Sequence, residues 1–396
     1  MKNLLNLEYS LVQGTYWMYY GIACSFASVF LLDKDYSNSQ IGAIFAFGSI
    51  LSVLIQPALA NFTDRSKKFS LLNVIEGLVL AILVLNTGLL FFESQSILLT
   101  TIYIAIIALT TSGQPFINSL NFYLQRADCQ INFGLARSMG SLLFALMVAA
   151  LGSIVLRYGI VSIPISGQIV LILMLGFVFA THISFGKEKN KTFLKDEDEE
   201  HIKPIAFDEF VKRNKYFFIM SFGIIGLYFG NAVLNIFMMQ IVGSVGGNSA
   251  DMGRILSLMA ALEIPTMVLF MKIKKRFNCK TLIVVASFGF TIKVALCYLA
   301  KSVFLIFVAQ LTQLFAFALF LPAMVHFIDE VMDKREAVRG QALFIVMTTI
   351  GSVFSSILGG MILDLGGAST LLMVSTILSI IGTIIITLSI QKITAN

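Results

Sequence analysis

Glu263 stands in the middle of an apolar stretch, MAALEIPTMVLF, and Lys293 occupies the middle of the next apolar stretch. At the centre of a bilayer each charge would cost roughly 2.5–3.5 kcal/mol if it were isolated. Both residues therefore need a partner, a hydrated cavity or a neutral state. An apolar setting favours the protonated carboxyl, and a nearby cation opposes this. The two groups could couple proton binding to solute binding, although a structural ion pair between helices would use the same residues.

Arg137 lies near the start of a third apolar stretch, in NFGLARSMGSLLFAL. Arginine can hold a carboxylate in a bidentate pair or donate several hydrogen bonds to the hydroxyls of a sugar. Near a membrane boundary it can equally extend to water. Side-chain amides suit hydroxyl-rich or amide-bearing solutes because they both donate and accept, and they also join neighbouring helices. The candidate amides in apolar stretches are Gln114, Asn118, Asn231, Asn235, Gln310 and Gln313.

Aromatic residues are concentrated in YWMYYG, residues 16–21. Their rings could stack on a sugar or on another ring, and an interfacial aromatic belt would explain part of the pattern equally well. We include Tyr19 among the candidate solute-binding residues.

The composition indicates that these stretches lie in a membrane. Of the 396 residues, 57% are hydrophobic and only 13% are charged, whereas a soluble domain is about a quarter charged. A membrane helix needs about 20 apolar residues, and this length predicts twelve helices. The first six are 11–32, 41–60, 71–92, 97–118, 134–156 and 159–182, and the second six are 216–243, 253–271, 281–300, 302–327, 341–363 and 368–391.

We therefore expect an all-α membrane protein made of two six-helix bundles, 1–186 and 216–396, joined by a polar linker, 187–215. The acidic run KDEDEE fits a solvated linker, and a regulatory site is the alternative. Twenty-two of the 28 lysines and arginines fall on the side that holds the N-terminus, and four fall on the other. The positive-inside rule then predicts that both termini are cytoplasmic. This bias accounts for the net charge of +6 without a nucleic-acid partner.

The sequence gives little support for a metalloprotein, an ATP-driven pump or a membrane enzyme. The four cysteines and three histidines lack metal-ligand spacing, so we expect no metal site and no cofactor. An ATP-driven pump would need a GxxxxGK[ST] loop, which is absent from the sequence. A membrane enzyme would need clustered acids at the surface. The cluster that the sequence offers alternates with Lys334 and Arg335, and it comprises Asp329, Glu330, Asp333 and Glu336.

The two halves echo each other. SQIGAIFAFGSILSVLIQPALANFTDRSKKF and DMGRILSLMAALEIPTMVLFMKIKKRF each enter with a glycine, carry a late proline and end in a basic loop. Six plus six helices with a cytoplasmic linker is the parallel-repeat plan of the major facilitator superfamily, which binds solute at mid-membrane between its halves.

Several stretches resemble lactose permease and its oligosaccharide–proton symporter relatives. IGAIFAFGSILSVLIQPALANFTDR is similar to their second helix, and the match includes Asp64 and Arg65 of a conformational loop. FGLARSMGSLLFAL is similar to their fifth helix and places Arg137 at the sugar-binding arginine. The spacing from Gly253 to Lys293 matches theirs from the eighth helix to the ninth-helix arginine.

The sequence departs from that family at positions that bind sugar and carry protons. Asn118 stands where the family has a glutamate, and Phe144 where it has the tryptophan that stacks on the sugar. Gln313 and Ala316 stand where it has a histidine and a glutamate, and Lys293 replaces an arginine. In the conformational loop, Ala60 and Lys67 replace glycines.

A second stretch, ALEIPTM, resembles the eighth-helix motif of bacterial sugar efflux transporters, and the match includes Glu263. The resemblances imply a multi-pass transporter of the bacterial inner membrane. We expect proton-coupled symport of a small polar solute, a sugar or glycoside, by alternating access, and we expect the protein to be a monomer. Proton antiport that exports sugars or drugs is the alternative. Glu263 and Lys293 would couple protons, and the expected solute-binding residues are Arg137, Asn118, Gln114, Phe144, Asn231, Asn235, Gln313 and Tyr19.

Overall fold

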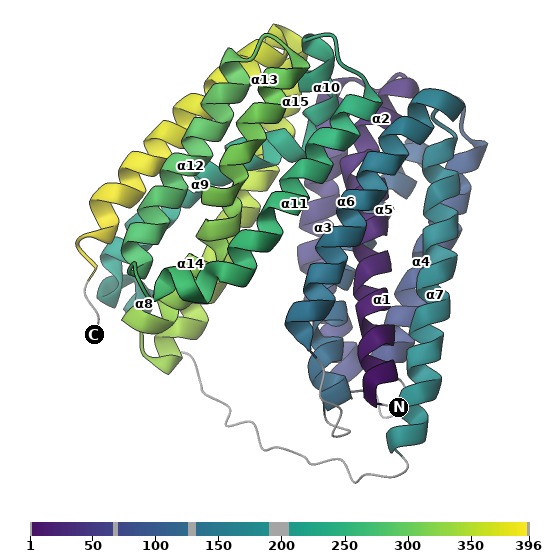
Figure 1. The fold of residues 1–396 in the computed structure, drawn as a ribbon, viewed down its shortest axis with the longest axis horizontal. Helices are drawn as coiled ribbons and strands as arrows, with labels where there is room; N and C mark the ends of the chain where they lie inside the picture. Colours follow the sequence, from purple (N-terminus) through teal and green to yellow (C-terminus); the bar gives the residue numbers. More distant parts are fainter. Residues whose placement is uncertain (1, 66–69, 126–131, 190–205, 394–396) are drawn as a thin grey trace. The chain divides into compact units, whose positions relative to one another are not determined.

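The computed structural model describes residues 2–65, 70–125, 132–189 and 206–393, and most of these residues lie in helices (Figure 1). The helices before the linker are α1 (Lys2–Tyr20), η1 (Gly21–Ser25), α2 (Ala27–Asp33), α3 (Asn38–Arg65), α4 (Leu71–Gly88), η2 (Leu89–Phe91), α5 (Ile97–Gln125), α6 (Phe133–Tyr158) and α7 (Ser162–Lys189). Those after it are α8 (Phe207–Arg213), α9 (Lys215–Ile236), α10 (Met238–Ser244), α11 (Ser249–Lys274), α12 (Cys279–Leu299), α13 (Val303–Ala309), η3 (Gln310–Phe315), α14 (Phe317–Val331) and α15 (Lys334–Ile390).

The described helices confirm the predicted fold class. Eleven are long and apolar enough to cross a membrane, and the last of them covers 55 residues. At 1.5 Å per residue that helix would be about 80 Å long, well over the ~30 Å thickness of the hydrocarbon core. Its backbone leaves the helical region at Gly367, where φ is 70°, a conformation that favours glycine. α15 therefore crosses twice, which gives the twelve crossings predicted from the sequence.

The chain forms two compact units. The first comprises Met1–Asp198 with Met252–Ala260, and the second comprises Glu199–Asp251 with Ala261–Asn396. In the first unit α1 packs against α6 and α7, α4 packs against α5 and α7, and α3 packs against α5. In the second unit α15 packs along α9, and α12 packs against both α14 and α15 (Figure 1). The predicted bundle boundaries stay a prediction.

Four predicted spans are not the continuous α-helices that we expected, and one of them, 71–92, ends in the 3₁₀ turn η2. The span 11–32 begins earlier, at Lys2, and contains the π-helical turn η1. The span 216–243 is broken at Phe237. The span 302–327 contains η3, a 3₁₀ turn. Hydropathy measures length and apolarity, and such breaks change neither. Within the predicted linker, residues 207–213 form the short helix α8, which buries Phe210 completely.

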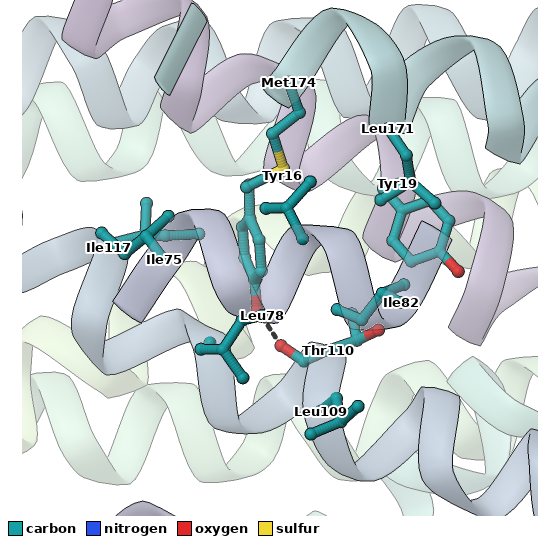
Figure 2. A pocket seen from close by; sticks show the side chains of 12 residues that line it. Tyr16, Tyr19, Ile75, Leu78, Ile82, Leu109, Thr110, Ile117, Leu171 and Met174 are labelled. Carbon is teal, nitrogen blue, oxygen red and sulfur yellow. Dashed lines mark hydrogen bonds between the residues drawn. The ribbon is translucent and has the colours of Figure 1, made fainter. Parts of the chain in front are cut away.

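A small apolar cavity of about 20 Å³ lies inside the first unit, among α1, α4, α5 and α7 (Figure 2). The Tyr16 hydroxyl donates to the carbonyl oxygen of Thr110 at 2.9 Å beside it. Gly113 lines the same cavity, and a Cβ built there would lie 3.8 Å from the Tyr16 ring, an ordinary contact. A cavity this small fits a packing defect better than a solute site.

We predict that Gly113→Ala stabilises the protein. Alanine is favoured over glycine inside a helix by about 0.5–1 kcal/mol, and its methyl group would fill empty space. The check is the thermal unfolding midpoint of the purified protein in detergent. A matched substitution, Gly48→Ala, should lower that midpoint, because its Cβ would lie 2.7 Å from the side chain of Ile107. A lower midpoint for Gly113→Ala would contradict the prediction.

Candidate functional site

A chain of three polar side chains crosses the interior of the second unit. The Lys293 ammonium donates to Gln313 Oε1 at 2.6 Å, and Gln313 Nε2 donates to Glu263 Oε1 at 2.8 Å. Lys293 is completely buried, and Gln313 is 2% exposed. The two charged residues that the sequence singled out are therefore brought together, with a glutamine between them. Its amide oxygen faces the cation and its amide nitrogen faces the carboxylate, so each end of Gln313 meets the charge that it can bond.

Three helical segments position this chain of side chains. Glu263 lies on α11, Lys293 on α12, and Gln313 on η3, where the tenth predicted span loses its α-helical form. Gly289 on α12 allows the close approach of η3, because a Cβ there would lie 2.5 Å from the carbonyl oxygen of Phe315. The absence of a side chain at Gly289 thus places the turn that carries Gln313 directly against α12.

Side chains satisfy carbonyl groups around η3. Thr312 Oγ1 donates to the carbonyl oxygen of Ala309 at 2.7 Å, and Thr266 Oγ1 on α11 donates to that of Leu314 at 3.2 Å. Buried carbonyls without partners are costly, and irregular backbone within a membrane needs such local bonds. The broken turn is therefore held from α11, the helix that carries Glu263.

Gln310 is buried on the same turn. Its Nε2 atom donates to the carbonyl oxygen of Ile306 at 3.1 Å and contacts Cys297 Sγ at 3.4 Å. Gln310 and Gln313 are three residues apart, and the sequence predicts that they share a face. Gln313 bonds to Lys293, whereas Gln310 bonds to the turn before it and to the cysteine one helical turn after Lys293. Gln310 is thus a structural neighbour of the polar chain.

The first unit holds a second polar group, centred on α1. Gln13 is completely buried, and its Nε2 atom donates to Asn118 Oδ1 on α5 at 3.1 Å and to the Tyr9 hydroxyl at 2.9 Å. Asn118 stands where the lactose permease family, which the sequence resembles, has a glutamate. Its side-chain oxygen accepts a hydrogen bond from the neighbouring helix. Its amide nitrogen remains a donor that can serve a solute.

One turn further along α1, Trp17 contacts Arg137 of α6, the predicted solute-binding arginine. The guanidinium carbon of Arg137 lies 4.3 Å from the centre of the Trp17 ring, and Arg137 Nη1 donates to Ser141 Oγ at 2.9 Å. Trp17 also contacts the rings of Tyr16 and Tyr20, at 5.4 and 5.2 Å between centroids. Arginine on a tryptophan face is attracted by the ring quadrupole. Trp17 thus fixes the direction of the guanidinium.

Gly140 provides the space for this arrangement, so we predict that Gly140→Ala disturbs it. A Cβ there would lie 2.5 Å from Trp17 Cδ1 and would push the indole away from Arg137. The chain has a single tryptophan, so emission excited at a wavelength that tyrosine does not absorb reports on this ring alone. We expect a shifted emission spectrum, and a solute affinity about fivefold weaker if the cation–π contact contributes about 1 kcal/mol.

The matched control for that prediction is Gly134→Ala on the same helix. Its Cβ would meet only Asn132 Oδ1, at 3.5 Å. The control should leave the emission spectrum unchanged. An identical spectrum for Gly140→Ala and the wild type would show that the ring does not depend on this space.

The other predicted solute-binding residues lie in different settings. Tyr19 is 1% exposed, and its hydroxyl donates to Asn86 Oδ1 at 3.3 Å. Phe144 lies against Gly21 of η1. Asn235 is exposed, and its Nδ2 donates to the backbone carbonyl of Asn231 at 2.8 Å. Gln114 is partly buried on α5. The roles of all five in solute binding stay predictions.

Asp64 and Arg65 close α3, and their side chains lie outside the described part of the chain. Two acids of the surface cluster are paired: Glu330 meets Lys274 at 2.9 Å, and Glu336 meets Arg213 at 3.6 Å. Among the described residues no group of histidines, cysteines and acids could hold a metal ion. These pairs join neighbouring segments of the second unit.

Gln13 was not among the residues predicted from the sequence, and Trp17 was included only as part of the aromatic run 16–21. The signal that could have found them is their spacing, because Tyr9, Gln13 and Trp17 are four residues apart and so share one face of α1. Five aromatic and sulfur-containing residues in a row, YWMYY, conceal this face, since together they surround the helix.

Twelve crossings, with buried polar groups inside membrane helices, define a polytopic transporter of the major facilitator type. The model of the MFS_1 like family matches residues 9–374, and the chain belongs to this family.

Individual proteins agree with that assignment. The chain is 23% identical over 395 residues to YwbF of Bacillus subtilis (strain 168), an uncharacterized transporter, and the match covers 96% of this chain and 94% of YwbF. The fold is similar to the nucleoside transporter NupG, with a TM-score of 0.74, 15% identity and 98% of each chain covered. It is also similar to a bacterial homologue of the human lysosomal transporter Spinster, with a TM-score of 0.68, 14% identity and 99% and 97% coverage.

Proposed function

We propose that the protein is a proton-coupled symporter of a small hydroxyl-rich solute, of the sugar or glycoside class, working by alternating access. The observation that carries this proposal is the hydrogen-bonded series Glu263–Gln313–Lys293, in which Gln313 and Lys293 are buried and Glu263 is half-buried. Ionisable side chains within membrane helices are costly and mark substrate or ion pathways. A buried ion pair also adds little stability compared with apolar side chains of similar volume.

Glu263 is the proposed proton-binding group. As a carboxylate it accepts from Gln313 Nε2, and the Lys293 charge at the far end of Gln313 supports that state. A proton on Glu263 would remove the negative charge and weaken its bond to the amide. Gln313 cannot itself take up a proton at ordinary pH, so it would hold the two charged groups in place without relaying protons between them.

The solute class rests on the polar groups of the first unit. Arg137, stacked on Trp17, offers several donors in a fixed plane. Asn118 adds an amide, and an amide both donates and accepts as a hydroxyl does. A mixed set of donors, acceptors and an aromatic ring suits a sugar or a glycoside. A nucleoside is a glycoside that also carries a ring, and the similarity to NupG, a nucleoside transporter, adds this class to those worth testing.

Binding can be tested through the emission of Trp17 in the purified protein. Monosaccharides, disaccharides and nucleosides are added in turn, and Arg137→Gln serves as the comparison. We expect a saturable change with one class that is absent or at least about tenfold weaker in the variant, since a hydrogen bond to a charged group contributes about 1.5–3 kcal/mol. No saturable response to any sugar, glycoside or nucleoside would contradict the proposed class.

Direction is tested separately, in cells that express the protein. A symporter should make cells accumulate the labelled solute, whereas an exporter should make preloaded cells lose it faster. Faster loss would replace the symport proposal with proton antiport.

A further inference from the structure

A buried carboxyl group on α1 is separate from the hydrogen-bonded side chains of Glu263, Gln313 and Lys293. Glu8 is 8% exposed and lies near the first turns of α1. Its Oε1 atom accepts a hydrogen bond from Ser184 Oγ on α7 at 2.9 Å. Its Oε2 atom is buried and has no hydrogen-bond partner among the described residues. Half of this carboxyl group is thus cut off from water and from donors.

The charged side chains that the structure describes on the neighbouring helices contact residues other than Glu8. On α7, His182 contacts Glu76 of α4, with 2.9 Å between Nδ1 and Oε1. On α6, Arg137 lies on Trp17, more than two turns along α1 from Glu8. The described part of α5 carries no charged side chain. The side chains of Lys2, Lys187 and Lys189 lie outside the described residues.

This setting favours the neutral form of Glu8. An ionised carboxylate needs a cation or several donors when it is removed from water, and without them it takes up a proton instead. Ser184 supplies one donor, and the described residues supply no cation. A neutral carboxylic acid needs less: its carbonyl oxygen accepts from Ser184, and the unmet bond of its hydroxyl costs far less than a buried charge.

We propose that Glu8 is a proton-binding site of the first unit, occupied in the conformation described here. The carbonyl oxygen of the protonated group is the one that Ser184 bonds, and Oε2 carries the proton. This site is separate from Glu263, which belongs to the second unit. Whether the chain moves sugars or another solute does not affect it.

Infrared spectroscopy of the full-length protein, purified and held at neutral pH, tests the proposal. A protonated carboxylic acid has a carbonyl stretching band that a carboxylate and an amide lack. We expect wild type to show this band and Glu8→Gln to lose it, while Glu263→Gln and Glu76→Gln keep the Glu8 component. Glutamine has the shape of the protonated acid, so Glu8→Gln should fold.

Ser184→Ala gives an independent readout if Glu8→Gln is poorly expressed. Without the hydroxyl donor, the band should persist and move to higher wavenumber, because a free carbonyl is stiffer than a hydrogen-bonded one. His182→Gln should leave the band where it is. A spectrum in which Glu8→Gln matches wild type, or in which Ser184→Ala shifts nothing, would overturn the proposal and leave Glu8 as an ionised residue that merely joins α1 to α7.

Discussion

Glu263→Gln should abolish accumulation of the solute driven by a proton gradient, while exchange of labelled for unlabelled solute continues. We expect gradient-driven uptake to fall to the level of protein-free liposomes, because an amide cannot take up the coupled proton. Exchange does not require net proton movement, so it should persist wherever the solute still binds. The measurement is uptake and counterflow in proteoliposomes.

The reason lies in what the substitution retains and what it removes. The amide oxygen of the new side chain can still accept from Gln313 Nε2, which lies 2.8 Å from the carboxylate in the wild type. Packing and hydrogen bonding are therefore largely preserved. The negative charge and the ability to bind a proton are lost. Lys293 then carries the sole charge among the three hydrogen-bonded side chains.

Asp251→Asn is the matched control, because Asp251 lies at the first turn of the same helix, α11. There it accepts from the backbone of Asn248 in a capping box, a role that asparagine can keep. This variant should transport like wild type. Equal gradient-driven uptake by Glu263→Gln and wild type would remove Glu263 from proton coupling and leave it as a structural residue.

The second large effect concerns the contact between α9 and α15. Gly382→Leu should destabilise the protein by about 3 kcal/mol, seen as a lower unfolding midpoint and a loss of monodisperse protein. A Cβ at Gly382 would lie 2.4 Å from the carbonyl oxygen of Gly223. The obstacle is backbone, which cannot rotate aside as a side chain can, so the two helices would have to separate.

On the α9 side of the contact there is likewise no room for a side chain, because a Cβ at Gly226 would lie 2.4 Å from the carbonyl oxygen of Leu378. Small residues that permit such approach are typical of helix interfaces in membranes. Gly243→Leu is the control, since nothing lies within 4 Å of a Cβ at that position, and it should change the midpoint little. A Gly382→Leu protein as stable as this control would show that the two helices are not in close contact.

The sequence predicted the twelve crossings, and it singled out the two charged side chains that Gln313 links in the structure. Each span can be predicted from its length and apolarity. Glu263 and Lys293 stand out because a charge in the middle of a membrane is costly. Their connection through one side chain was not predictable. It depends on Gln313, which lies on a 3₁₀ turn that hydropathy does not reveal and whose position depends on Gly289 in another helix.

The first unit shows a second limit of sequence reasoning. Tyr19 and Trp17 stand two residues apart in one aromatic run, and the sequence offers no means of choosing between them. The rotation of α1 decides: Tyr19 bonds to Asn86, whereas Trp17 lies beneath Arg137. That rotation is fixed by packing against α6 and α7, where Gly140 leaves room for the indole. Long-range contacts of this kind have no local signature.

The most direct test of proton-coupled transport is the movement of protons caused by the solute itself. Proteoliposomes without any imposed gradient enclose a pH-sensitive dye, and the solute that binds in the fluorescence assay is then added outside. Symport predicts that the interior acidifies as solute enters, and that the signal disappears in Glu263→Gln and on addition of a protonophore. Solute entry with no change of internal pH would contradict proton coupling and would leave a facilitative transporter.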